Sequence, residues 1–262
     1  MRQIIYIVIC LFYATFTVAQ DTRLEQFSTG DDSRGWEAVG RLDIADKGFC
    51  TATLIDDRTV LTAAHCVFEK SGVISADRLT FSAGLRNGRA EAYRDVRRVF
   101  THPNYDPLLI ENDVRIIAYD LAILELTQPI RTTKIQPIPV ASNLPRGQDI
   151  GVVSYARDRA EAPSIQEVCH TIGKQDQILI MTCDINFGSS GAPVFRLKNG
   201  QAEIVSVISA ISDLNGDTVS LGASLGNPLT ELRAQSSAPI RIQTNTLTPG
   251  ERGNTGAKFI RP

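Results

Sequence analysis

Aromatic side chains are scarce in this chain, and neither sign of charge is in excess. Of 262 residues, 6% are aromatic, and 27 basic against 29 acidic side chains leave a formal net charge of −2. Binding to a phosphate backbone needs clustered Lys and Arg, so this balance argues against a general nucleic-acid-binding role. The 43% hydrophobic content excludes a wholly disordered chain. The length suits one large β domain or two small ones.

Long helical patterns are also missing, because no extended stretch repeats apolar residues at the 3.6-residue spacing. Instead, 19 glycines and 12 prolines separate short runs rich in Val, Ile and Thr, which favours an all-β fold. Asn-Gly pairs at 87–88, 199–200 and 215–216 indicate hairpin turns. One short helix is expected, with Asn227 as its N-cap and Ala234 as its last residue. We expect strands at 51–55, 59–62, 96–100, 121–126, 150–155, 177–182 and 203–211.

The only long apolar run lies at the N-terminus. A charged Arg2 precedes an almost wholly apolar stretch over 4–19, and small residues lie before Gln20. This layout predicts a secretory signal peptide over 1–19, because the run is shorter than the ~20 residues that a membrane-spanning helix needs. The mature protein is therefore expected to be secreted or periplasmic, monomeric and free of the membrane.

The two ends of the mature chain differ in composition from its centre. Residues 20–35 are polar and are expected to form a loosely held leader. Residues 235–262 carry Pro, Gly and Thr with little apolar surface to bury, so a flexible tail is expected there. No internal repeat is visible in the sequence between them.

Four cysteines remain once the predicted signal peptide is removed. Export to an oxidising compartment predicts that these cysteines form two disulfides. Three pairings are possible among Cys50, Cys66, Cys169 and Cys183. Pairing of sequence neighbours closes two loops of about 15 residues, each contributing about 3 kcal/mol by the chain-entropy model. The alternative is a zinc site that combines cysteines with His65 and His170. The chain lacks the C-x-x-C spacing typical of zinc sites, so we expect neither a metal nor another cofactor.

Three short segments carry side chains suited to nucleophilic catalysis. His65 follows two alanines, Asp120 precedes an apolar strand, and Ser190 lies in the segment Phe-Gly-Ser-Ser-Gly-Ala-Pro. A serine hydroxyl is a weak nucleophile that needs a neighbouring base, and a buried carboxylate needs a partner. Taken alone, such a histidine is more often structural, and the aspartate and the Gly/Ser turn are also consistent with structural roles. Histidines 102 and 170 and aspartates 106 and 113 are the alternatives, and their sequence contexts suit packing or loops better.

Taken together and in this order, the three segments closely resemble those of the trypsin-like (chymotrypsin-fold) serine endopeptidases. The segments are Thr-Ala-Ala-His-Cys, Asp-Leu-Ala-Ile-Leu and Gly-Ser-Ser-Gly-Ala-Pro-Val, and the resemblance covers residues 36–234. It is nearest to the bacterial secreted branch that includes glutamyl endopeptidases. The resemblance implies two six-stranded Greek-key β-barrels with the active site between them. The first barrel is expected over 36–135 and the second over 136–234.

The same resemblance assigns a role to each candidate residue. Ser190 would be the nucleophile, His65 the general base and acid, and Asp120 the residue that orients the imidazole. The amides of Gly188 and Ser190 would form the oxyanion hole. The resemblance also selects the pairs Cys50–Cys66 and Cys169–Cys183.

The chain departs from the pattern of animal trypsins at two places. Ser189 stands where those enzymes carry an Asp that captures a new N-terminal amine. Local hydrogen bonds alone are therefore expected to hold the oxyanion hole. Asp184 lies where trypsin binds Lys or Arg side chains, but Ile208 stands where trypsin keeps a glycine in the pocket wall that Ser206 begins. Asp184, Ser206 and Ile208 are thus the candidate specificity residues, and their signals conflict.

Three functions fit these residues. The first is an exported serine endopeptidase that hydrolyses protein or peptide substrates through an acyl-enzyme. The second is a catalytically inert protease-fold module that binds a partner. The third is an esterase-like hydrolase, which would require a Gly-x-Ser-x-Gly segment placed before the His, and the chain has neither. Retention of all three candidate residues favours the first.

Overall fold

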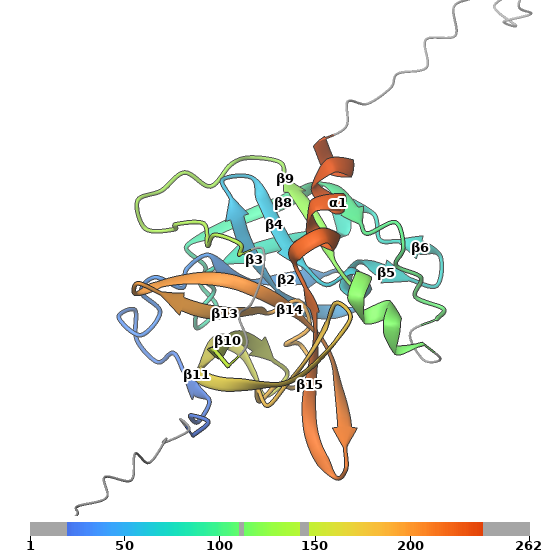
Figure 1. Cartoon of the computed structure of the whole chain (residues 1–262). Helices are drawn as coiled ribbons and strands as arrows, with labels where there is room; N and C mark the ends of the chain where they lie inside the picture. The colour runs from blue at the N-terminus through green and yellow to red at the C-terminus, as the bar shows by residue number, and fades with distance from the viewer. Residues whose placement is uncertain (1–19, 110–112, 142–146, 238–262) are drawn as a thin grey trace, which may run out of the picture.

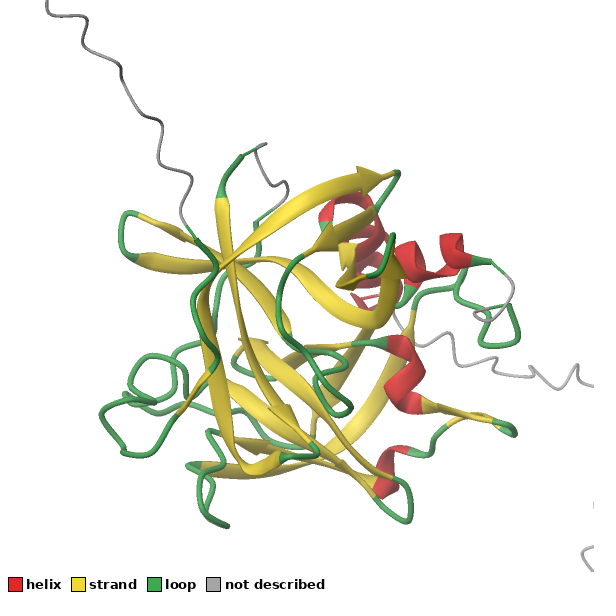
Figure 2. Ribbon diagram, turned by 90° about the horizontal axis from the view of Figure 1, so that it is seen from below, coloured by secondary structure: helices red, strands yellow, loops and turns green. Residues whose placement is uncertain are grey.

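The computed structural model describes residues 20–109, 113–141 and 147–237. The predicted signal peptide lies outside these residues, and so does the expected tail from residue 238 onward. Within the described part of the chain, no helix is long and apolar enough to span a membrane. The chain there is built from antiparallel strands, with one α-helix and three short 3₁₀ helices (Figure 2).

The first barrel is a closed ring of six strands in the order β2-β3-β4-β9-β8-β7 (Figure 1). Residues 50–55 of its strand β3 are all buried, and this strand contacts the second barrel. The bounds are β2 Val39–Ile44, β3 Gly48–Asp56, β4 Thr59–Thr62, β7 Leu79–Ala83, β8 Ala92–Thr101 and β9 Ala122–Leu126. A small hairpin projects from it, formed by β5 Phe68–Glu69 and β6 Gly72–Val73, and the 3₁₀ helices are η1 Ala64–Val67, η2 Ala76–Arg78 and η3 Val114–Tyr119.

The second barrel has strands in the order β11-β10-β13-β14-β15-β12, and the pairing of β11 with β12 closes the ring. Its bounds are β10 Asp149–Ala156, β11 Arg159–Gln175, β12 Ile178–Met181, β13 Pro193–Lys198, β14 Gln201–Leu214 and β15 Asp217–Ser224. When the six strands of each barrel are numbered in chain order, both rings have the same order of neighbours: first, second, third, sixth, fifth and fourth. The first strand is β2 in one barrel and β10 in the other. The predicted fold of two six-stranded barrels is thus confirmed, and it contains a structural repeat that the sequence does not reveal.

Most of the expected strands and turns are confirmed. All seven expected strands are present, several of them longer than expected. The Asn-Gly pairs at 199–200 and 215–216 join β13 to β14 and β14 to β15, and the pair at 87–88 closes the Arg86–Arg89 bridge between β7 and β8. The asparagines have φ of 50°, 52° and 58° at positions 87, 199 and 215, the left-handed conformation that this dipeptide accepts.

The polar segment 20–35 is fixed in place, contrary to the expectation of a loose leader. Strand β1 (Glu25–Gln26) pairs with β11, the Thr22 amide donates to Val168 O at 2.9 Å, and Phe27 is buried. Asp21 also forms an ion pair with His170. Backbone pairing to a strand edge, which composition does not register, holds this segment on the second barrel.

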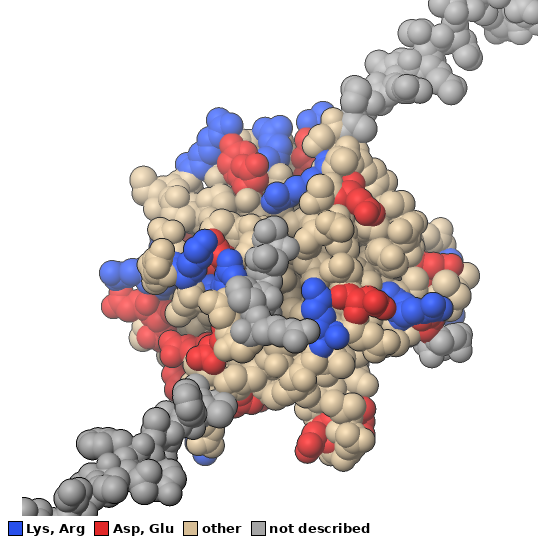
Figure 3. Space-filling model, viewed as in Figure 1, with Lys and Arg blue, Asp and Glu red and all other residues tan. Residues whose placement is uncertain are grey.

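The one α-helix, α1 (Gly226–Ser237), follows the second barrel but packs against β8 and β9 of the first (Figure 1). It buries Pro228, Leu229 and Leu232. It begins before the expected cap Asn227 and continues past Ala234, so residues 235–237 belong to it. On the face in Figure 3, basic and acidic side chains are interspersed, with no large patch of one sign.

Candidate active site

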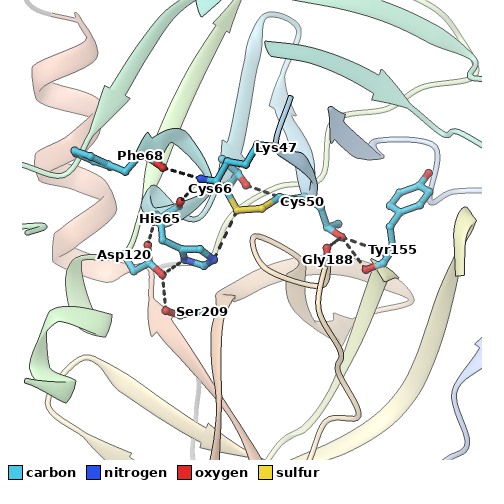
Figure 4. The surroundings of a disulfide bond; sticks show 11 residues. Lys47, Cys50, His65, Cys66, Phe68, Asp120, Tyr155, Gly188 and Ser209 are labelled. Atoms are coloured by element: carbon cyan, nitrogen blue, oxygen red, sulfur yellow. Dashed lines mark hydrogen bonds and ion pairs between the residues drawn. A yellow bond between two sulfur atoms is a disulfide. The ribbon is translucent and has the colours of Figure 1, made fainter. Parts of the chain in front are cut away.

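His65 lies in the short helix η1, directly after β4 of the first barrel. Ala63 and Ala64 before it are fully buried, so only small side chains fit there. Cys66 after it is joined to Cys50 on β3, which ties η1 to the barrel wall (Figure 4). The second predicted disulfide, Cys169–Cys183, is also present. Both pairings are confirmed, and the Cys50 and Cys66 sulfurs beside His65 are not thiolates that could ligate zinc.

Asp120 is fully buried between η3 and β9, and its carboxylate faces His65 (Figure 4). Oδ1 accepts a hydrogen bond from the His65 backbone amide at 2.8 Å, and Oδ2 lies 2.7 Å from His65 Nδ1. The Ser209 hydroxyl, from β14 of the second barrel, also donates to Oδ2. Three donors thus satisfy the buried carboxylate, and the arrangement fixes the imidazole with its Nδ1 toward Asp120.

These contacts shift the acid–base behaviour of both groups. Burial opposes ionisation of Asp120, but the charge of His65 and the three hydrogen bonds outweigh it and hold the pKa of Asp120 below its ordinary value. Burial likewise opposes protonation of His65, yet Asp120 outweighs it and raises the pKa of His65. Lys47 lies close enough to reduce that rise. The pair is therefore poised with a charged Asp120 and an unusually basic imidazole.

Ser190 lies on the connection from β12 to β13, in a tight turn between two glycines. Gly188 and Gly191 have φ of +100° and +81°, in the left-handed region that side chains disfavour. Among the residues that the structure describes, the amides of Gly188 and Ser190 donate to no other group. An oxyanion site requires free N–H groups beside the nucleophile, and these two amides are the candidates for it.

The first barrel holds this turn through one residue, Thr51 on β3. The Thr51 amide donates to Ser190 O at 2.9 Å, and the Thr51 hydroxyl donates to Gly188 O at 2.9 Å. The same hydroxyl accepts a hydrogen bond from the Tyr155 amide at 3.0 Å. Thr51 thus joins the first barrel to both the serine turn and β10.

Gly191 marks the closest approach of the two barrels at this turn. A Cβ atom there would lie 2.1 Å from Thr62 Oγ1 and 2.2 Å from Thr51 O. Such distances are far below van der Waals contact, so only glycine fits. The position directly after Ser190 is therefore defined by the first barrel as well as by its own strand.

His65 and Ser190 both face a cavity of about 600 Å³ at the junction of the barrels. His65 Nε2 points away from Asp120 and lies 3.9 Å from Cys66 Sγ. No hydrogen bond joins it to Ser190 Oγ in the described structure. Two cations, Lys47 and Arg157, also line the cavity, and its described lining includes no carboxylate. The apolar lining consists of Ile44, Phe49, Ile185, Phe187, Ile208, Ala210 and Ile211.

The candidate specificity residues are not gathered in this cavity. Ile208 lines it, but Asp184 is exposed outside it, and the Asp184 amide is held by Gln166 Oε1 at 2.7 Å. Ser206 is buried within the second barrel and donates to Ala223 O at 2.8 Å. Asp184 and Ser206 do not line the described cavity, and their assignment as specificity residues stays a prediction.

Ser209, three residues after Ser206, contacts Asp120 although the sequence did not predict it. An irregularity in the pairing of β14 with β15 between Ile208 and Ala210 turns Ser209 toward Asp120 and brings Ala210 and Ile211 to the cavity. The sequence offers two serines at this spacing with similar neighbours, and nothing local distinguishes them. Only the extra residue in the strand decides which one reaches the site.

The alternative residues lie elsewhere. His102 is buried against Tyr119, with ring centroids 4.9 Å apart, and His170 forms its ion pair with Asp21. Asp106 and Asp113 hold nearby loop amides, that of Leu108 at 2.9 Å and that of Arg115 at 3.0 Å. These four side chains have structural contacts and are not at the cavity.

Sequence comparisons place these observations among known proteins. The chain matches the family model described as Trypsin over residues 29–221. It is 35% identical over 103 residues to Trypsin from Phaedon cochleariae, covering 39% of this chain and 36% of that protein. It is 29% identical over 209 residues to Serine protease filzig from Drosophila melanogaster, covering 66% of this chain and 12% of that protein. Inactive serine protease PAMR1 from Homo sapiens is 32% identical over 107 residues, covering 36% of this chain and 13% of that protein.

The chain thus spans little more than a third of the first of these relatives and about an eighth of the others. Among solved structures, it resembles a thermostable serine protease from an extremophilic microorganism with a TM-score of 0.62. The two are 19% identical, and the match covers 78% of this chain and 98% of that one. At this identity the likeness supports the fold alone.

Proposed function

Because the chain belongs to the trypsin family of serine proteases, we propose that it is an active, exported endopeptidase that cleaves proteins or peptides. Its narrower placement in the bacterial secreted branch stays a prediction, since the relatives reported above come from animals. Two disulfides support export, because such bonds persist in oxidising compartments. A secreted or periplasmic location, a monomeric state and a signal peptide over 1–19 belong to the same proposal. So does the division of the remaining chain into a first barrel over 36–135 and a second over 136–234.

The observation that supports catalysis most is the fully bonded Asp120 behind His65. A buried carboxylate that accepts from Nδ1 leaves Nε2 of a neutral imidazole as the basic nitrogen. Nε2 faces the same cavity as Ser190. In substrate-free sites the nucleophile–base contact is often long and tightens in the complex.

The reaction then follows from the residues present. Ser190 Oγ attacks the peptide carbonyl carbon while its proton passes to His65 Nε2. The carbonyl oxygen becomes an oxyanion that accepts hydrogen bonds from the Gly188 and Ser190 amides. Collapse of the intermediate breaks the C–N bond, and the imidazolium donates its proton to the leaving amine. A water molecule, deprotonated by His65, hydrolyses the acyl-enzyme and regenerates Ser190.

The cavity favours apolar side chains at the cleaved residue. Ile208, Ala210 and Ile211 line it, and the carboxylate of Asp184 lies outside it. A Lys or Arg substrate side chain would find no described counter-charge there and would lose hydration without compensation. We therefore infer cleavage after apolar residues in preference to basic ones.

The competing function is an inert module that binds a partner, and it is worth testing because the human relative is an inactive serine protease. Labelling with a fluorophosphonate probe, which bonds only to an activated serine, separates the two. We expect stoichiometric labelling of the native protein, none for Ser190→Ala, and normal labelling for the control Ser220→Ala, a buried serine of the same barrel that bonds to Met181 O. A folded native protein that is not labelled would overturn the proposal.

A further inference from the structure

Arg159, at the start of β11, is a buried cation next to the serine turn. Its side chain is 8% exposed. Nη2 donates to Ser154 Oγ at 3.1 Å and to Ser189 Oγ at 3.3 Å, and Nη1 lies 3.1 Å from the Asp158 carboxylate. Nε is buried and has no partner among the described residues. The roles proposed above leave this arginine unused.

Burying a guanidinium is costly unless a carboxylate compensates it. Asp158 is 61% exposed, so water screens its attraction for Arg159. Burial accordingly lowers the pKa of Arg159, against smaller opposing effects of Asp158 and Asp184. Asp184 therefore contributes part of the counter-charge of Arg159. Burial of the Arg159 guanidinium is thus unfavourable by itself, and its hydrogen bond to Ser189 indicates what the buried charge stabilises.

That reason lies in Ser189, the residue between the two candidate oxyanion amides. Its hydroxyl is fully buried and accepts from the Asn186 amide at 3.2 Å as well as from Arg159. It lies 3.3 Å from Tyr155 O, which accepts its proton. The peptide plane before Ser189 carries Gly188 O, and the plane after it carries the Ser190 N–H. The position of Ser189 therefore fixes the Ser190 amide directly and the Gly188 amide through the backbone of Gly188.

We propose that Arg159 is a positioning residue, whose guanidinium holds Ser189 and thereby keeps the Gly188 and Ser190 amides convergent on the cavity. The proposal rests on the proposed function. It corrects the expectation that neutral local hydrogen bonds alone hold the hole. The loop is held by an internal cation, and no chain terminus is needed to order it.

The location of the N-terminal segment agrees with this assignment. Asp21 lies beside His170 and Asp149, at the beginning of β10, whereas Ser189 contacts Ser154 five residues further along that strand. At about 3.3 Å per residue, the two places are about 16 Å apart. An amine at the start of the mature chain is therefore remote from Ser189, while Arg159 is in contact with it.

Kinetics of arginine variants test the proposal directly. For Arg159→Met we expect kcat on a small peptide ester to fall by about 10²-fold with KM within twofold, because misplaced amides weaken only the transition state. Arg159→Lys, which keeps a cation, should recover at least tenfold of the loss. The control Arg196→Met removes an equally buried arginine of the same barrel, paired with Glu203, and should lower Tm without changing kcat. Full activity of a folded Arg159→Met, or an equal kcat loss in the control, would overturn the proposal.

A second set of variants covers the case in which Arg159→Met fails to fold. Ser189→Asp places a carboxylate against the guanidinium, so in the native background we expect Tm to be unchanged or raised. In the Arg159→Lys background, the carboxylate of Ser189→Asp should still give a higher Tm than the amide of Ser189→Asn. A Tm lowered by several degrees in Ser189→Asp alone would show that the guanidinium does not face position 189.

An extension fused ahead of Gln20 provides an independent test of the role of Arg159. With an internal cation in place, the fused protein should retain most of the native kcat after active-site titration. Inactivity that ends only when proteolysis frees an N-terminus would overturn the proposal. Failure of the native protein to react with the fluorophosphonate probe would instead contradict the proposed function. That experiment is done before any variant is compared, so the two failures are distinguishable.

Discussion

The two barrels repeat one strand order, and each places a glycine of its first strand under a phenylalanine ring of its fourth. In the first barrel a Cβ on Gly40 would lie 2.5 Å from the Phe81 ring, and in the second a Cβ on Gly151 would lie 2.5 Å from Phe195. The packing of the two cores is therefore related in detail. At the cleft between them the likeness ends.

The first barrel fixes its part of the site through charge. His65 and Asp120 hold each other by two hydrogen bonds, and a disulfide ties η1 to β3. The second barrel presents Ser190 through backbone geometry, with two left-handed glycines and the neutral hydroxyl of Ser189. The difference teaches that the base should respond to pH, because His65 and Asp120 both titrate. The nucleophile turn should instead respond to changes in shape and to loss of the hydrogen bonds that Thr51 and Arg159 make to it.

The largest effect is expected from removing the charge of the first barrel. Asp120→Asn keeps the size of the side chain but removes the acceptor that holds Nδ1–H, so we expect kcat/KM to fall by about 10⁴-fold. Tm should fall by only a few degrees, because Ser209 and the His65 amide keep partners. Steady-state kinetics and thermal unfolding of the same preparation check both. Activity within tenfold of native would show that Asp120 does not orient the base.

A smaller effect is expected from cutting the link between the barrels. Thr51→Val preserves shape but removes the bonds to Gly188 O and from the Tyr155 amide. We expect kcat to fall by about 10- to 100-fold and Tm to drop, since a lost buried hydrogen bond costs about 1–3 kcal/mol when a partner stays unsatisfied. Thr51→Ser is the matched control, because it keeps the hydroxyl, and it should stay within a few-fold of native. Equal behaviour of Val and Ser at this position would contradict the role of the hydroxyl.

The two disulfides should differ in function more than in stability. They span similar separations, 16 and 14 residues, so each should contribute about 3 kcal/mol. Replacing Cys50 and Cys66 by Ala should also reduce kcat several-fold, because that bridge adjoins His65, whereas replacing Cys169 and Cys183 should leave kcat near native. Thiol titration of the denatured, unreduced mature chain should detect no free thiol. Two reactive thiols, or equal kcat losses, would contradict this account.

The smallest effect is the separation of the pH ranges for activity and stability. The pKa of His65 is raised, so the acid limb of kcat/KM should have its midpoint above the ordinary 6.5. Its contribution to stability is fully present below 6.5 and is lost as pH rises through the folded pKa. The lowered pKa of Asp120 contributes above 3.8 and is lost as pH falls through its folded pKa.

Both contributions are therefore complete only between pH 3.8 and 6.5, below the range of full activity. Parallel profiles of Tm and kcat/KM against pH measure this separation. In Asp120→Asn the decline of Tm above pH 6.5 should disappear. Coincident maxima for Tm and activity in the native protein would contradict the assigned shifts.

The sequence was informative where chemistry is local. The Asn-Gly turns, the neighbouring cysteine pairs and the two-barrel fold were all predicted correctly. Eight strands were not predicted, and apart from the β5–β6 hairpin each of them pairs with a strand that is distant in the chain: β1, β2, β5, β6, β7, β11, β13 and β15. The place of Ser209 depends on a strand irregularity, and the contact of Arg159 with Ser189 depends on pairing across a barrel. Neither has a signature in the local order of residues.

The contact at Gly191 also limits which amino-acid substitutions the two barrels can accept during evolution. One of the atoms in its way is the side-chain oxygen of Thr62, which a smaller residue removes, but the other is the carbonyl oxygen of Thr51. A carbonyl belongs to every amino acid, so no second substitution makes room for a methyl group. The residue after Ser190 is thereby closed to stepwise replacement. Exchange of either barrel with that of a relative preserves the site only where the incoming backbone follows the same path to a fraction of an ångström.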